Sequence, residues 1–510
     1  MSVPQTMSPG AVTGSKRPGL VLACVCACTI LVVGLVAAIN LAVPMLAASG
    51  LHPSSSELLW IVDAYVVVFA CLVIPGGAAG DRFGRKGVLI AGLVTFAAGA
   101  SISAASASVT SLLLGRAITG VGAALVLPNG VGVLVHATVP ERRTRAIAIW
   151  GAMTGMGGLI GNIAGAALLT TGSWRILFGA IVPIALLCAF WTSLVVRRSS
   201  RSPRSLDPAG TALLVAATFA LLIGIIEGPE RGWSSAIVSA AFVASVVLGA
   251  AWVVVELRVR HPLLDPRLFR SPLLSTVSLG MLVMFFGSFG LFYLNASLLQ
   301  YGRGYSVLQA GFAIVPMTVP MLIGAQFVPN LVRRIGIPAT LSAAFLAIGI
   351  GLSGLTTAVN QPYLVYAAWL FLIGVGFALA LPCLTAELTA ALPAEQAGVA
   401  GGLQSATREL GSALGVAVVG TVLTESFTRH LPANLQHAEQ IPRTVAEAVA
   451  AAPAQQAAII DSFTTGAESA LQVASVVTLI AGILVVAAAF QASRRRSEQS
   501  STIMDSTASK

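Results

Sequence analysis

The stretch from Ile61 to Ala104 reads IVDAYVVVFACLVIPGGAAGDRFGRKGVLIAGLVTFAAGASISA. Two apolar runs, each about 20 residues long, flank a short charged turn between Gly77 and Lys86. A run of that length lets an α-helix cross about 30 Å of hydrocarbon. Neither run alternates apolar and polar residues, which excludes a membrane β-barrel and predicts two membrane-spanning helices.

The same pattern of long apolar runs and short charged turns continues along the whole chain. The 510 residues are 56% hydrophobic and 9% charged, whereas soluble domains carry about 25% charged residues. We therefore predict an all-α integral membrane protein with fourteen spans. The predicted spans are 20–46, 57–76, 88–106, 111–134, 146–169, 176–196, 209–227, 234–256, 274–299, 307–329, 337–357, 362–386, 399–424 and 467–490.

The basic residues are distributed unevenly between the two sets of loops. With a cytoplasmic N-terminus, most of the 29 Lys and Arg residues fall in cytoplasmic loops and tails. The outer loops hold five, namely Arg175, Arg231, Arg303, Arg429 and Arg443. This asymmetry predicts a multi-pass protein of the inner cell membrane with both termini cytoplasmic. It also accounts for the net charge of +10 without a nucleic-acid partner.

An internal repeat relates the two ends of the chain. Gly120–Pro128 reads GVGAALVLP and Gly374–Pro382 reads GVGFALALP, eight predicted spans later. Repeated halves are how secondary transporters build a midplane site that opens alternately to each side. We predict the following domains: tail 1–18, N-terminal six-helix half 19–199, two inserted helices 205–257, C-terminal six-helix half 272–492 with outer loop 425–466, and tail 493–510. The Ser-rich tails are expected to be disordered, and the outer loop to hold a short amphipathic helix.

The turn after the second span carries glycines and charges in a fixed order, GAAGDRFGRK from Gly77 to Lys86. The glycines permit a tight turn, the acid can face the positive N-terminus of a helix in the other half, and the arginines can latch it. The string resembles the cytoplasmic loop signature of the major facilitator superfamily. The residues interpreted as this cytoplasmic gate are Gly77, Asp81, Arg82, Gly84, Arg85 and Lys86.

Further motifs resemble the fourteen-span drug:proton antiporter branch of that superfamily. They are Trp60–Tyr65 in span two, Leu114–Gly122 in span four, Ser173–Arg175 before span six and Arg408–Gly411 in span thirteen. The resemblance implies a major facilitator fold and proton-coupled export of structurally varied, often cationic or amphipathic drugs.

The chain departs from that branch in two places. The branch's span-five motif, Gly-Pro-x-x-Gly-Gly, here reads GNIAGA over 161–166, so close helix approach is kept and the proline kink is lost. Our span-five motif comprises Gly157, Gly161, Asn162 and Gly165. In span one, Leu35 stands where the branch usually has an acid. We therefore expect substrates with at most one positive charge.

Four ionisable residues lie well inside predicted spans, away from the span ends: Asp63, Arg116, Arg408 and Glu409. A charged residue at the centre of a span costs about 2.5–3.5 kcal/mol on insertion scales, so each invites a functional interpretation. We interpret all four as candidates for proton coupling. The alternative is that they pair only structurally, or pack between the halves.

The function predicted from these residues is proton-coupled export of small lipophilic or monocationic drugs and antibiotics. The alternatives are an uptake symporter for a small metabolite and a membrane sensor or scaffold that transports nothing. The five histidines form no catalytic set and no phosphate-binding loop is present, so we expect neither an enzyme nor a cofactor. Cys24, Cys26 and Cys28 point to different sides of one helix and are interpreted as packing residues, not metal ligands. The expected partners are the substrate, protons and the lipid bilayer, and the expected state is a monomer.

Overall fold

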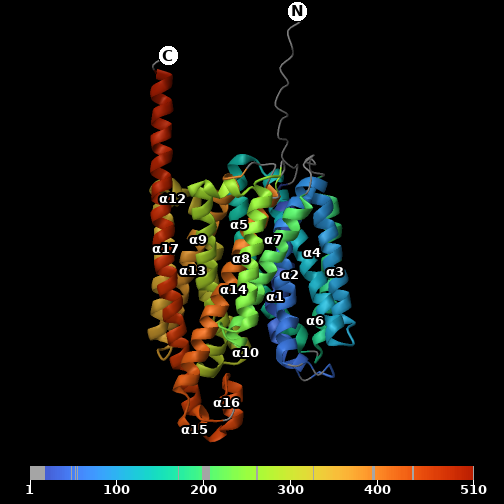
Figure 1. Cartoon of the computed structure of the whole chain (residues 1–510), viewed down its shortest axis with the longest axis vertical. Helices are drawn as coiled ribbons and strands as arrows, with labels where there is room; N and C mark the ends of the chain where they lie inside the picture. Colours follow the sequence, from blue (N-terminus) through green and yellow to red (C-terminus); the bar gives the residue numbers. More distant parts are fainter. Residues whose placement is uncertain are drawn as a thin grey trace, which may run out of the picture.

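The computed structural model describes residues 18–47, 49–51, 53, 55–170, 172–197, 207–259, 262, 264–324, 327–392, 397–438 and 441–508. Within these ranges the regular structure is helical throughout. Figure 1 shows one bundle whose long helices run roughly parallel to each other. The prediction of an all-α fold is confirmed.

The long helices follow the predicted spans closely. The first eight are α1 (Pro18–Ala47), α2 (Ser55–Phe83), α3 (Arg85–Ala104), α4 (Val109–Ala137), α5 (Pro140–Leu169), α6 (Trp174–Val195), α7 (Pro208–Arg231) and α8 (Ala236–Glu256). The others are α9 (Pro272–Ser297), α12 (Val328–Ala358), α13 (Tyr363–Ala390), α14 (Ala397–His430) and α17 (Gln456–Ala508). In the described part of the chain, 13 helices are long and apolar enough to cross a membrane.

The tenth predicted span, 307–329, is not one continuous helix. Two shorter helices occupy it, α10 (Val307–Phe312) and α11 (Val315–Gly324). Pro316 and Pro320 fall in α11, and a proline both lacks an amide hydrogen and clashes with the preceding turn. Just before α10, the last turn of α9 widens into a π-helix, η2 (Leu298–Gly302).

The chain beyond α14 is more helical than expected. The outer loop holds α15 (Ala433–Gln436), α16 (Val445–Ala451) and the short η4 (Pro453–Gln455). The C-terminal tail continues α17 to Ala508, so the expectation of a disordered tail is wrong for 493–508. This segment contains neither Gly nor Pro to stop the helix. The N-terminal tail, residues 1–17, lies outside the described residues.

The repeated glycine motif packs in the same way in both halves. In α4, a Cβ added to Gly120 would lie 2.7 Å from the carbonyl oxygen of Tyr65 in α2. In α13, a Cβ added to Gly374 would overlap the carbonyl oxygen of Met317 in α11. Only glycine allows backbones to approach so closely. The partner helices occupy equivalent places in the repeat, because α2 is the second span and α11 belongs to the tenth.

The charged turn also has a counterpart in the other half. Gly84, between α2 and α3, has φ 101°, and Gly336, at a kink within α12, has φ 82°. Residues with a side chain rarely adopt such angles. The two glycines occupy equivalent turns, because α12 corresponds to α3 in the repeat.

The two halves meet where α14 packs on α2 and α4. A Cβ on Gly401 would lie 2.9 Å from the carbonyl oxygen of Pro128, and one on Gly402 would lie 2.9 Å from the Cα of Ile74. These contacts lie toward the end of the bundle that carries Gly84. The inserted helix α7 covers the same junction, since Leu222 packs in a small core with Val67, Ala70 and Cys71 of α2. The second inserted helix, α8, packs on α7 and is buried at few positions.

We expect Gly374→Ala to lower the melting temperature of the purified protein. The new methyl group would overlap the Met317 carbonyl, and overpacking of this kind costs about 1–3 kcal/mol. Gly158→Ala is the matched control, because nothing lies within 4 Å of a Cβ at that position. Equal melting temperatures for the two variants would show that the close packing of α13 on α11 does not require the glycine of the repeated motif.

Candidate functional site

Arg116 of α4 is the largest fully buried side chain in the described part of the chain. Its Nε donates to the carbonyl oxygen of Ile61 at 2.8 Å, and its Nη2 donates to that of Val62 at 3.0 Å. Its third nitrogen, Nη1, is buried with no hydrogen-bond partner among the described residues. The guanidinium thus ties α4 to the backbone of α2 while its charge stays incompletely compensated.

Asp63 and Tyr65 complete the environment of Arg116. The Asp63 carboxylate is close enough to act electrostatically on Arg116, so the structure brings these two candidates together. The Tyr65 ring lies under the guanidinium, with its centroid 4.9 Å from the Arg116 Cζ. The Tyr65 hydroxyl donates to the Val32 carbonyl oxygen at 3.3 Å. The cluster therefore connects α1, α2 and α4.

Arg408 and Glu409 face this cluster from α14. Although successive helical residues point about 100° apart, the two side chains pair with each other. The Arg408 Nε and Nη2 donate to Glu409 Oε1 at 2.9 and 2.7 Å. The Arg408 guanidinium lies 5.7 Å from the centroid of the Phe69 ring. Both charges act electrostatically on Tyr65.

Tyr65 and Phe69 link Arg116 to the Arg408–Glu409 ion pair. Their rings stack with centroids 6.2 Å apart. The Arg116 guanidinium lies over the Tyr65 ring, and the Arg408 guanidinium lies near the Phe69 ring. A change of charge on either side therefore acts across the junction between the halves.

Sequence reasoning missed the role of these two rings. Tyr65 stands in the quoted motif Trp60–Tyr65, and its spacing of four from Phe69 places both rings on one helix face. That spacing was the available signal. The sequence gives no means of telling which helix the face meets.

The gate residues Asp81 and Arg85 form a buried pair across Gly84. The Arg85 Nε donates to Asp81 Oδ1 at 2.8 Å, and the Nη2–Oδ1 distance is 2.7 Å. The Arg85 Nη1 donates to the Gly132 carbonyl oxygen of α4 at 3.2 Å and also contacts the His136 ring. His136, which we did not single out, thus joins Asp81 and Arg85 in one cluster of side chains, which we call the latch.

The remaining gate residues stay close to the N-terminal half. Lys86 Nζ donates to the carbonyl oxygen of Ser193 in α6 at 2.7 Å. The Arg82 guanidinium lies 5.4 Å from the centroid of the Phe83 ring, and Gly77 is buried within α2. The helix end expected opposite Asp81 is the start of α14, and residues 393–396, which precede it, lie outside the described residues.

Asn129 was also missed, although it explains a glycine of the motif. Its Nδ2 donates to the carbonyl oxygen of Gly76 at 2.9 Å. A Cβ on Gly80 would overlap the Asn129 side chain. Gly80 is therefore required for the approach of α4 to α2 near the gate.

The span-five glycines are explained by packing on α1. A Cβ on Gly161 would overlap the backbone of Gly34, and one on Gly165 would lie 2.7 Å from the Ala38 Cβ. Gly157 faces α1 in the same row, and a Cβ added to it would lie 2.9 Å from the Val33 Cβ. Asn162 is exposed and takes no part in this contact, so the structure does not join it to the charged cluster.

No group of three His, Cys, Asp or Glu residues that could hold a metal ion occurs in the described part of the chain. The six cysteines are buried and unpaired.

Comparisons with known proteins agree with this architecture. A family model for the Major Facilitator Superfamily matches residues 25–416. The tetracenomycin C resistance and export protein of Streptomyces glaucescens is 30% identical over 420 residues, which cover 82% of this chain and 77% of that protein. The multidrug resistance protein Stp of Mycobacterium tuberculosis is 31% identical, covering 79% and 75%. The methyl viologen resistance protein SmvA of Salmonella typhimurium is 30% identical, covering 83% and 88%.

Solved structures show the same fold at low sequence identity. The human organic anion transporter MFSD10 aligns with a TM-score of 0.62 and 17% identity, over 92% of this chain and 99% of that one. The proton:xylose symporter XylE aligns with a TM-score of 0.61 and 16% identity, over 92% and 94%.

We expect Asp81→Asn to lower the melting temperature, because it leaves the buried Arg85 guanidinium without its charged partner. Breaking a buried ion pair costs about 3–5 kcal/mol. Glu141→Gln is the control, an exposed acid at the start of α5. Adding Arg85→Gln to Asp81→Asn should restore part of the loss, since the uncompensated charge is removed. A melting temperature for Asp81→Asn equal to that of the control would rule out the latch.

Proposed function

The chain belongs to the Major Facilitator Superfamily, and we propose that it is a proton-coupled exporter of small lipophilic or monocationic drugs and antibiotics. The observation that carries the proposal is that Tyr65 and Phe69 connect the buried Arg116, on which Asp63 acts electrostatically, with the ion pair of Arg408 and Glu409. Structural neighbours of the same fold include transporters, and relatives are named for drug resistance and export.

Proton coupling requires a carboxylate that is ionised in one state of the transporter and protonated in another. Glu409 is suited to this role, because its carboxylate forms an ion pair with Arg408 and a proton bound to the carboxylate would remove the charge from that pair. Arg408 would then be uncompensated next to Phe69 of α2. Protonation of Glu409 thereby changes the energy of the contact between α14 and α2, which joins the two halves.

Asp63 is the second candidate for proton coupling. It acts on Arg116, but two α2 carbonyl groups hold that guanidinium in place whether or not Asp63 is charged. We therefore propose that Glu409 binds the proton that drives transport, and that Asp63 only modulates this step.

The proposed orientation has both termini in the cytoplasm. The arginine-rich loops support it, and it places the Asp81–Arg85 latch inside and α15 and α16 outside. In this orientation the close contacts of Gly401 and Gly402 lie toward the cytoplasmic end. The proposed unit is a monomer in the inner cell membrane, and its partners are the substrate, protons and lipid.

The proposed substrates carry at most one positive charge. Leu35, at the position where related antiporters usually have an acid, is buried and apolar. A desolvated cation needs a partner, and a dication would need about two. The relative SmvA is named for resistance to methyl viologen, a dication, which makes this molecule a stringent comparison.

An uptake symporter remains the alternative function, because fold alone does not fix the direction of transport. XylE, a proton:xylose symporter, has the same fold. Cells that make the protein should hold less ethidium than matched cells without it. Greater accumulation would favour uptake.

The substrate prediction compares a monocation with a dication. We expect the protein to protect cells against ethidium by about tenfold or more, which corresponds to 1.4 kcal/mol of preference, and to protect little against methyl viologen. The measurement is the inhibitory concentration of each compound with and without the protein. Strong protection against methyl viologen alone would contradict the role assigned to Leu35.

The coupling prediction concerns ethidium transport in proteoliposomes with an imposed pH gradient. Glu409→Gln should abolish gradient-driven transport while ethidium still binds, because the variant has no carboxylate to titrate at this position. Asp63→Asn should slow transport and shift its pH dependence. Glu425→Gln, on an exposed face of the same helix, is the control and should transport normally. Full, still pH-driven transport by Glu409→Gln would remove this residue from the mechanism.

A further inference from the structure

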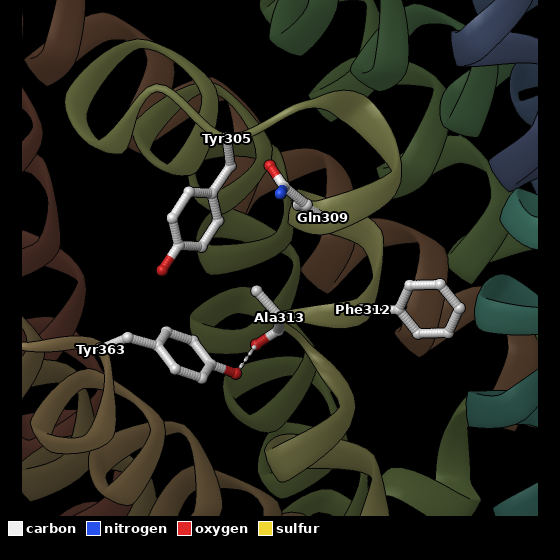
Figure 2. A pocket seen from close by; sticks show the side chains of 5 residues that line it. All are labelled: Tyr305, Gln309, Phe312, Ala313 and Tyr363. Carbon is white, nitrogen blue, oxygen red and sulfur yellow. Dashed lines mark hydrogen bonds between the residues drawn. The ribbon is translucent and has the colours of Figure 1, made fainter.

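A cavity of about 460 Å³ lies at the end of the bundle opposite the Asp81–Arg85 latch. Its lining comes from the segment after η2, from α10 with the residue that follows it, and from the start of α13 (Figure 2). The lining residues are Tyr305, Gln309, Phe312, Ala313 and Tyr363. Sites for drug-sized ligands have volumes of about 300–1,000 Å³.

The cavity has aromatic walls. The Tyr305 and Tyr363 rings have centroids 6.2 Å apart and are tilted by 56°. Phe312 supplies a third ring and is more than half exposed, at 53%. Aromatic walls of this kind favour planar ring systems, which bury much area and stack on them. The helix that carries Phe312 also contacts α5, so the cavity adjoins the N-terminal half.

Polar groups at the edge of the cavity are held in defined orientations. Gln309 Oε1 accepts from the Ser306 backbone amide at 2.9 Å, which fixes the side chain and leaves its Nε2 group as a donor. Figure 2 shows this nitrogen on the side of Ala313. The Tyr363 hydroxyl donates to the Ala313 carbonyl oxygen at 3.0 Å, so its own oxygen can still accept. A ligand with hydroxyl or carbonyl groups on the edge of its ring could accept a hydrogen bond from the Gln309 Nε2 and donate one to the Tyr363 hydroxyl oxygen.

A fixed positive charge lies behind the aromatic wall. The Arg303 Nη2 donates to the carbonyl oxygens of Ala358 and Gln361, both at 2.8 Å. Its guanidinium lies over the Tyr366 ring at 5.0 Å and acts electrostatically on Tyr363. The five lining residues include no acid. The local potential is therefore positive, which disfavours cations.

We infer that this cavity, the aromatic pocket, binds planar hydroxylated aromatic molecules that are neutral or singly negative. This is a ligand class different from the monocations proposed for transport. The binding itself rests only on the geometry of the pocket.

The test uses two probes of matched shape, resorufin and proflavine. Both have three fused planar rings, but resorufin is a phenolate anion and proflavine is a monocation. Binding is followed by fluorescence anisotropy with the full chain in lipid nanodiscs, without any gradient. Tyr305→Ala should weaken resorufin binding by about tenfold, which corresponds to 1.4 kcal/mol, and leave proflavine binding unchanged.

Tyr301→Ala is the matched control for Tyr305→Ala. It removes a tyrosine four residues earlier, whose ring packs on Phe463 with centroids 5.7 Å apart, away from the pocket. Tyr363→Phe should weaken resorufin binding by a smaller factor, since the ring remains and only the hydroxyl is lost. Arg303→Gln should weaken resorufin and strengthen proflavine binding.

Two results would overturn the inference. One is equal resorufin affinity of Tyr305→Ala and Tyr301→Ala. The other is proflavine binding that depends on Tyr305 as strongly as resorufin binding does. Proton-driven ethidium transport by the unmodified chain in proteoliposomes separates the two proposals. Its absence, with resorufin binding intact in nanodiscs, would reject export and leave the pocket standing.

Discussion

A guanidinium buried between membrane helices must find its hydrogen bonds within the protein. Arg116 meets this demand with the backbone of α2, and this interaction sets the arrangement of the N-terminal half. The close approach that it needs is possible because Gly120, one turn further along α4, has no side chain to separate α4 from α2. Tyr65, lying under the guanidinium, then reaches α1 through its hydroxyl.

The same interaction lies at one end of a row of contacts that crosses the junction between the two halves. Arg116 fixes Tyr65, Tyr65 stacks on Phe69, and Phe69 lies against Arg408, which holds Glu409. Each step is a contact between described side chains, so a proton added to Glu409 alters the charge at a packed junction. Small residues such as Gly402 allow α14 to approach α2 closely at the same junction.

The fold was largely predictable because a bilayer imposes one length and one hydrogen-bonding solution on every span. The repeat and the turn at Gly84 followed from glycines whose roles are local. The break in the tenth span was not predicted, because Pro316 and Pro320 lie within a long apolar run that by length alone indicates one continuous helix. The site was predictable only in part. The depth of Asp63 and Arg116 in the membrane followed from their place in the predicted spans, but the pairing of Arg408 with Glu409 and the place of the Tyr65 and Phe69 rings depend on helix rotation.

The central proposal is that Glu409, at the charged junction between the halves, carries the proton that is exchanged for the drug. Calorimetric titration of the purified protein with ethidium, in two buffers that differ in ionisation enthalpy, tests it directly. If ethidium is exchanged for the proton on Glu409, its binding releases that proton, so we expect heats that differ between the buffers and no such difference in Glu409→Gln. Equal heats in both buffers for the unmodified chain would contradict the account.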